Sequence, residues 1–179
     1  MAETPTMQIL TGRMLFVGLC GTVLFFQLLP LDARPETWPM PDFLLLLVVL
    51  WSARRPDYAP VTFIAILMLM ADLLLQRPPG LWAGLVVIFT EVLRRRSRQL
   101  RNSPFLLEWG SVAAGIIAIN MVNRVAMAVV LLPQPAIGLT LIQMVMTILA
   151  YPIVVLVAHA IFGVSRPAPG ETDSFGHRL

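Results

Sequence analysis

Charged residues are scarce in this chain, and lysine is missing altogether. Only 13% of the 179 residues are charged, whereas about a quarter is usual for a soluble domain. The shortage is uneven, because the charges form short clusters between long apolar stretches, and the mean hydropathy is +0.80. Lipid rather than water is therefore expected to be the main solvent, which predicts an all-α bundle of transmembrane helices.

Cysteine is almost absent as well. Cys20 is the only one, which excludes an internal disulfide. It lies in an apolar run, where we expect it to pack as a small hydrophobic side chain. Arg13 precedes an apolar run that is long enough for a removable signal peptide, but no small-x-small cleavage site follows cleanly. An uncleaved first helix is therefore the favoured interpretation.

The motifs that carry catalysis are also missing. The sequence has no glycine-rich phosphate loop, no His-Glu-x-x-His pair and no Gly-x-Ser-x-Gly elbow. It has two histidines, of which His159 is expected to be an interfacial side chain and His177 belongs to the polar tail. These absences argue against an enzyme, and nothing in the sequence predicts a metal or a cofactor.

Six apolar segments are candidates for membrane spans, which need about 20 residues and at least roughly 17. We expect them at residues 14–30, 38–51, 60–75, 81–93, 104–132 and 137–162. The second, third and fourth are short, so re-entrant or merely buried segments are the alternative for them. The chain then consists of an N-terminal segment (1–13), a six-helix transmembrane domain (14–162) and a disordered polar tail (163–179).

The arginines predict the orientation of these spans. If all six cross and the N-terminus is cytoplasmic, ten of the thirteen arginines face the cytoplasm, and only Arg34 and Arg77 lie outside. Arg124 falls within a span. This is a strong positive-inside bias, so both termini are expected in the cytoplasm. Because the arginines border apolar segments, membrane lipid rather than nucleic acid is the expected partner.

One dense run of arginines follows the fourth span. Its members are Arg94, Arg95, Arg96, Arg98 and Arg101. The favoured interpretation is a topology anchor that attracts anionic lipid, at about 1 kcal/mol per residue near the surface. The alternative is a docking patch for a cytoplasmic partner. Glu91 and Glu108 lie close to this run in the sequence, and we expect them to form local ion pairs there.

Several polar side chains fall inside the predicted spans, all toward the outer side. They are Asp42, Asp72, Asn120, Asn123 and Arg124. Ionisable groups at membrane depth are costly and usually mark an interior contact or a function. An ion pair of Arg124 with either aspartate is geometrically possible. The cluster is interpreted as a set of polar contacts that hold the helices of the bundle together. The alternative is a polar pocket that binds a ligand or a partner helix.

The central stretch carries a further pattern. Pro41-Asp42 opens a leucine run, Trp51 is followed by Arg54-Arg55-Pro56, and Asp72 is followed by Arg77-Pro78-Pro79-Gly80-Leu81. With this order, this length and six spans, the chain resembles the MreD family of bacterial rod-shape-determining membrane proteins. The resemblance covers about residues 14–162, and its distinctive part is 41–81. One departure is that residues 67–71 lack the glycine often seen before the aspartate.

The resemblance implies a non-enzymatic scaffold of the cell-wall elongation machinery in the bacterial inner membrane. It implies MreC, a single-span periplasmic protein, as the direct partner. MreB filaments, the RodA glycosyltransferase and a penicillin-binding transpeptidase would belong to the same assembly. Small residues in the fifth span would allow another helix of the bundle or of a partner to approach closely; they are Gly110, Ala113, Ala114, Gly115 and Ala118.

The main alternative is the substrate-binding membrane subunit of an energy-coupling, vitamin-type transporter. Such subunits also have six helices and about 180 residues, and the MreD family is thought to share a related fold. A subunit of that kind needs a ligand pocket near the outer face, where the polar cluster is expected. A ligand-binding assay would distinguish it from a scaffold.

Overall fold

The computed structural model describes residues 5–29, 39–101 and 104–162, and these residues form six α-helices without any strand. The helices are α1 (Pro5–Leu28), α2 (Phe43–Arg54), α3 (Val61–Leu74), α4 (Leu81–Arg101), α5 (Phe105–Val129) and α6 (Ile137–Phe162). This confirms the all-α prediction. By length and composition, α1, α5 and α6 are each long and apolar enough to cross a membrane.

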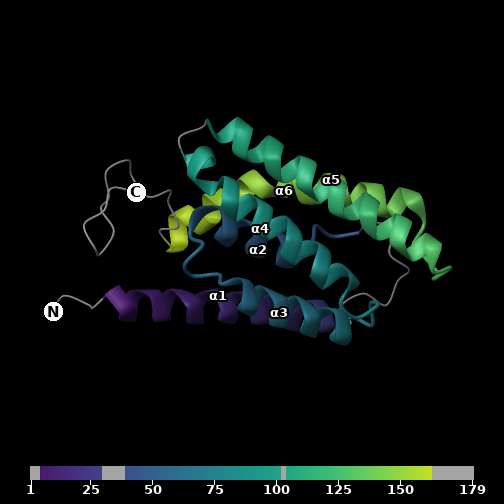
Figure 1. Cartoon of the computed structure of the whole chain (residues 1–179), viewed down its shortest axis with the longest axis horizontal. Coiled ribbons are helices and arrows are strands. Elements are labelled where there is room, and N and C mark those ends of the chain that lie inside the picture. The colour runs from purple at the N-terminus through teal and green to yellow at the C-terminus, as the bar shows by residue number, and fades with distance from the viewer. Residues whose placement is uncertain (1–4, 30–38, 102–103, 163–179) are drawn as a thin grey trace.

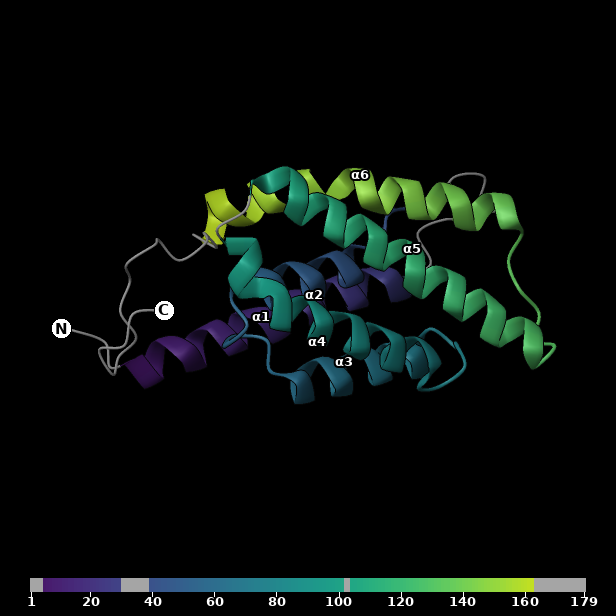
Figure 2. The same ribbon diagram turned by 45° about the horizontal axis from the view of Figure 1, so that its top comes forward.

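The helices are arranged in three layers of two (Figures 1 and 2). One outer layer holds α1 and α3, the middle layer α2 and α4, and the other outer layer α5 and α6. Across the layers, α2 packs on α1 and α6, while α4 packs on α3 and α5. The chain reverses direction between successive helices, so that α1 begins and α6 ends at the same end of the bundle (Figure 1).

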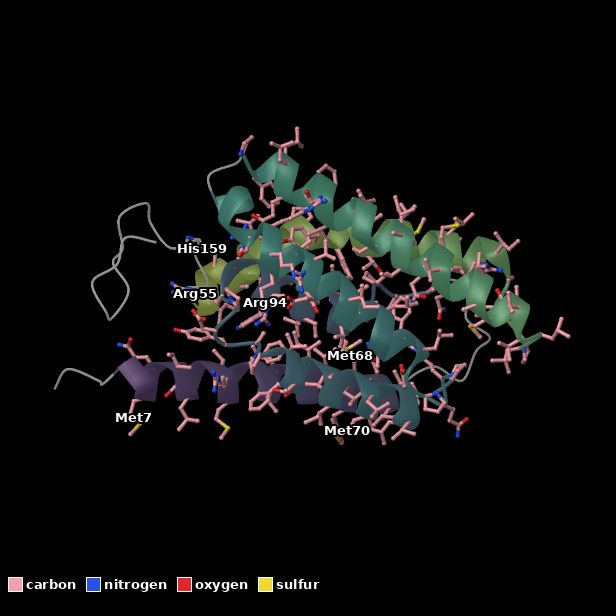
Figure 3. All side chains as sticks on the ribbon, viewed as in Figure 1. Met7, Arg55, Met68, Met70, Arg94 and His159 are labelled. Carbon is pink, nitrogen blue, oxygen red and sulfur yellow. The ribbon has the colours of Figure 1, made fainter. Side chains whose placement is uncertain are left out.

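The two ends of the bundle are named after the ends of α2. The Asp42 end holds the first residue of α2, the turn between α3 and α4 and the turn between α5 and α6. The Arg54 end holds the start of α1 and the last residues of α2 and α6. Figure 3 shows Arg55, Arg94 and His159 together at this end.

Helix α2 is the centre of the bundle. Ten of its twelve residues are buried, as expected for a helix that is apolar on all sides. Its twelve residues span about 18 Å, which is less than the roughly 30 Å of a hydrocarbon core. Asp42 caps its first turn, and Pro56 follows its C-cap residue Arg55, a position that disfavours continuation of a helix.

Helix α3, by contrast, buries a single face. Met68 is 1% exposed and lies between α3 and the middle layer, while Met70 is 52% exposed and points away from the bundle (Figure 3). After α3 the chain turns sharply into α4 through two left-handed residues, Gln76 (φ 54°) and Gly80 (φ 85°). Glycine adopts this conformation without the steric cost that a side chain adds.

The three largest differences from the predicted span boundaries are at the start of α1, the start of α2 and the end of α4. Helix α1 begins at Pro5 rather than at residue 14, and α2 begins at Phe43 rather than at 38. Helix α4 continues to Arg101, well past residue 93, because arginine is a good helix former even where hydropathy falls. The predicted disordered tail (163–179) lies outside the described residues.

Helices α4 and α5 approach closely at Gly115. A Cβ atom built there would lie 1.8 Å from Cε2 of Phe89, so the ring occupies the space of the missing side chain. A Cβ atom built at Gly110 would have no neighbouring atom within 4 Å. Of the small residues predicted to permit close helix approach, Gly115 therefore serves a contact within the bundle, and Gly110 faces open space.

Gly115→Ala is expected to lower the free energy of unfolding by about 1–3 kcal/mol, because the buried Phe89 ring must move. Gly110→Ala, the matched control, should leave stability unchanged or raise it by up to about 1 kcal/mol through the better helix propensity of alanine. The measurement is equilibrium unfolding in mixed micelles with a denaturing detergent. Equal stability of the two variants would contradict the close contact.

Candidate functional site

A polar cavity of about 210 Å³ lies at the Asp42 end, between the start of α2, the α3–α4 turn, α5 and α6. Its polar lining consists of Asp42, Arg77, Asn120, Asn123, Arg124, Gln134, Thr140, Gln143 and Thr147. Four of the five residues of the predicted cluster thus meet here. The fifth, Asp72, is not part of the lining.

Asp42 joins the start of α2 to α6. One carboxylate oxygen (Oδ1) accepts a hydrogen bond from the Leu45 backbone N–H at 3.0 Å, which caps the helix. The Asp42 backbone N–H donates to Oγ1 of Thr147 at 3.0 Å, and the Thr147 hydroxyl donates to the Gln143 carbonyl at 2.7 Å. These bonds hold the carboxylate of Asp42 at the rim of the cavity.

Arg124 joins α5 to the start of α6. Its Nη1 donates to Oγ1 of Thr140 at 2.8 Å and to the Pro135 carbonyl at 3.5 Å, while Gln134 Nε2 donates to the Arg124 carbonyl at 3.1 Å. Among the described residues no carboxylate lies within 4.0 Å of its guanidinium. The pair with Asp72 or Asp42 that the sequence left possible is therefore not formed, and neutral oxygens of Thr140 and Pro135 contact the guanidinium instead.

The two asparagines of the cavity bond within their own helix. Asn120 Nδ2 donates to the Ile116 carbonyl at 2.9 Å, and Asn123 Nδ2 lies 3.7 Å from the sulfur of Met127. Both side chains are half-buried. They add neutral polar surface to the cavity wall without joining α5 to another helix.

Asp72 caps the helix that follows it. It is fully buried, and its Oδ2 accepts hydrogen bonds from the backbone N–H groups of Gly80 at 3.0 Å and Ala83 at 3.1 Å. The first N–H groups of a helix have no partner inside it, and negative charge is favourable there. The aspartate thus stabilises the start of α4, which is a structural role that hydropathy alone did not indicate.

A second polar cluster, at the Arg54 end, is buried. The Nε atom of Arg54 lies 3.0 Å from Oε1 of Glu108, and the Tyr151 hydroxyl donates to the same oxygen at 2.7 Å. These residues are 7%, 2% and 0% exposed, so the cluster locks α2, α5 and α6 together. Arg54 of α2 is thus a partner of Glu108 that proximity along the chain did not predict.

The arginine run lies on the last turns of α4. Glu91 pairs with Arg95 at 3.0 Å and with Arg94 at 3.8 Å, which confirms the predicted local pairing for that glutamate. Arg94 also donates to the Ala59 carbonyl. The side chains of Arg98 and Arg101 lie outside the part of the chain that the structure describes.

An apolar groove of about 650 Å³ runs along the outer face of α4 and α5. Its lining includes small residues at a spacing of four along α5, namely Gly110, Ala114 and Ala118. Exposed branched side chains flank them, among them Ile88 of α4 and Val122 of α5. Small residues at this spacing let the backbone of a second transmembrane helix approach closely.

Within the described ranges, no group of three or more His, Cys, Asp or Glu side chains is placed to hold a metal ion. His159 is exposed in the last turn of α6. The arrangement therefore offers a polar binding cavity at one end, a buried ion pair at the other and an apolar groove along one side. Comparison of the chain with protein-family models, with curated proteins and with solved structures found no match.

Proposed function

We propose that the chain is a six-span protein of a bacterial inner membrane, with both termini in the cytoplasm. The alternating course of the helices supports this topology, since α1 begins and α6 ends at one end of the bundle (Figure 1). At that end lie Arg54, Arg55 and Arg94, as the positive-inside bias requires. Helix α2 is short, but it is enclosed by α1, α4 and α6 and so needs little lipid contact.

In this membrane the chain acts as a non-enzymatic scaffold of the MreD type, binding MreC and, through the assembly, MreB, RodA and a penicillin-binding transpeptidase. The observation that carries this function is the groove between α4 and α5. A single-span partner offers one helix of about 10 Å diameter, and the small residues Gly110, Ala114 and Ala118 leave room for it.

The residues behind the MreD resemblance support the proposal in another way. Asp42 caps α2, Arg54 forms the buried pair with Glu108, and Asp72 caps α4. Each of these three motif positions makes a polar contact that fixes a junction between elements. A family built on this bundle would have a physical reason to retain them.

The transporter subunit is the second candidate, and the polar cavity is the observation that favours it. Its volume of about 210 Å³ is below the roughly 300–1,000 Å³ of pockets that enclose a drug-sized ligand. A vitamin-sized substrate would need the cavity to widen. The scaffold therefore remains the preferred function.

Affinity purification of the tagged chain from its native membrane in mild detergent, followed by mass spectrometry, tests the scaffold. We expect recovery of MreC together with elongation enzymes. Ala114→Leu fills the groove and should reduce that recovery about tenfold, a loss of roughly 1.4 kcal/mol. Ala160→Leu makes the same change at an exposed position of α6 and should leave recovery unchanged. Recovery of an energy-coupling ATPase module instead would contradict the scaffold.

A further inference from the structure

The polar cavity at the Asp42 end carries more positive than negative charge. Arg77 and Arg124 both line it, and Asp42 is the one carboxylate in its described lining. One oxygen of Asp42 is already engaged by the Leu45 N–H at the start of α2. Within the described ranges, neither guanidinium has a carboxylate oxygen within 4.0 Å. The cavity thus presents two cationic groups and a single, partly engaged anionic group.

The contacts of both arginines are with uncharged groups. Arg124 donates to the Thr140 hydroxyl at 2.8 Å and more weakly to the Pro135 carbonyl. The guanidinium carbon of Arg77 lies 5.9 Å from the ring centroid of Trp82. Such contacts orient a guanidinium without neutralising it, and each group keeps N–H donors for an anion.

Trp82 contributes an independent observation. It lines the same cavity and is 8% exposed, and its indole N–H is buried with no acceptor among the described residues. A buried donor is normally satisfied, and an unsatisfied one calls for an explanation such as an absent ion or ligand. The N–H has almost no accessible surface as the ring stands, so an anion in the cavity would supply the missing acceptor after a small rotation of the ring.

We propose that this cavity binds a phosphate group, held by Arg77, Arg124 and the indole N–H of Trp82. Guanidinium groups match the geometry of phosphate oxygens and bind them through paired hydrogen bonds. A volume of about 210 Å³ equals roughly seven water molecules, enough for a phosphate with a small adjoining group. The apolar part of the lining, including Leu45, Ile116 and Met144, accommodates the remainder of the ligand.

This site goes beyond the scaffold function and does not depend on it. The phosphate can come from free inorganic phosphate or from the head group of a membrane lipid. The phosphate group is recognised in the same way in both cases. The head group, however, remains attached to the glycerol and acyl chains of its lipid, whereas inorganic phosphate binds alone. Each source therefore needs its own arm of the experiment.

The purified full-length chain in dodecyl maltoside is titrated with inorganic phosphate, at ionic strength held constant with chloride. In a second arm it is titrated with dioleoylphosphatidylglycerol, with dioleoylglycerol as the control that lacks phosphate. The readout is the midpoint of thermal unfolding, followed by tryptophan fluorescence. We expect a saturable rise in at least one arm. A response to inorganic phosphate identifies a free anion as ligand, and a response to the phospholipid alone identifies a head group.

Variants then locate the site. Arg77→Gln and Arg124→Gln should each weaken the apparent Kd about tenfold or more, since each loses a charge-assisted contact. Trp82→Phe keeps the ring beneath Arg77 but removes the N–H donor, and should weaken binding less. Arg95→Gln is the charge-matched control, because Arg95 is exposed and pairs with Glu91. The proposal is overturned if neither arm raises the midpoint, or if Arg77→Gln and Arg124→Gln bind as tightly as Arg95→Gln.

Discussion

Glu108→Gln is expected to lower the free energy of unfolding by about 3–5 kcal/mol, the largest loss that we expect from any single substitution in this bundle. The Glu108 carboxylate is buried between the Arg54 guanidinium and the Tyr151 hydroxyl. Glutamine has nearly the same size but no charge. The substitution therefore leaves the positive charge of Arg54 in the interior without its counter-ion, which costs more than the loss of one exposed contact.

The matched control is Glu91→Gln, which removes the same charge from an ion pair whose Arg95 side chain is 78% exposed. Exposed pairs contribute less than about 1 kcal/mol, so this variant should unfold nearly as the unmodified chain does. Unfolding in mixed micelles with a denaturing detergent measures both. Arg54→Met combined with Glu108→Leu should be more stable than Glu108→Gln, because neither charge of this buried pair then remains. Equally small losses at Glu108 and Glu91 would contradict a buried ion pair.

Asp72→Ala is expected to have the second largest effect, a loss of about 2–4 kcal/mol in the free energy of unfolding. The substitution leaves the Gly80 and Ala83 backbone N–H groups without their acceptor. A buried donor without a partner costs about 1–3 kcal/mol, and loss of a helix cap by itself typically costs about 1 kcal/mol. The start of α4 should loosen first, which hydrogen exchange of residues 80–84 would detect.

Asp42→Ala is the control for this prediction, because Asp42 also caps a helix but is half-buried and accepts one capping bond. Its loss should cost about 1 kcal/mol. Asp72→Asn keeps one acceptor and should lie between the two. Asp72→Ala and Arg124→Ala share no contact and should be additive within about 0.5 kcal/mol. A coupling energy between the two substitutions larger than this would indicate an ion pair between Asp72 and Arg124.

The helical architecture was predictable from the sequence, while several helix ends were not. Apolar runs separated by proline-containing turns predicted every helix, and α6 agrees with its predicted range of 137–162. Helix α1 begins at Pro5, before the predicted span, because hydropathy marks where lipid is favourable and a helix can begin in polar sequence before that point. The arginine run continues α4 for the same reason.

The candidate site was predictable in part. The predicted depth of each residue along its span placed Asp42, Asn120, Asn123 and Arg124 at one level of the bundle. The structure confirms that these four residues line one cavity. The prediction failed for Asp72, whose partners are backbone N–H groups only eight and eleven residues further on. Charge patterns along a sequence predict pairs of charged side chains and carry no signal for such backbone partners.

The buried pair of Arg54 and Glu108 was missed for a different reason. Proximity along the chain predicts that each glutamate pairs with the nearest arginines, which holds for Glu91 within one helix. Glu108 lies 54 residues from Arg54. Which helices become neighbours depends on the three-layer arrangement, in which α2 contacts α6 and lies close to the α5–α6 layer. Which helices pack against each other cannot be read from short segments of a single sequence.

Site-specific photo-crosslinking in the native membrane tests the central claim, that the α4–α5 groove receives the helix of a single-span partner. A photoreactive residue replaces Leu107 or Val122, which are 57% and 51% exposed and line the groove. The control position is Ile153, which is 63% exposed on α6. Adducts with MreC from the groove positions and none from Ile153 are the predicted result. MreC adducts from Ile153 with none from Leu107 or Val122 would contradict the account.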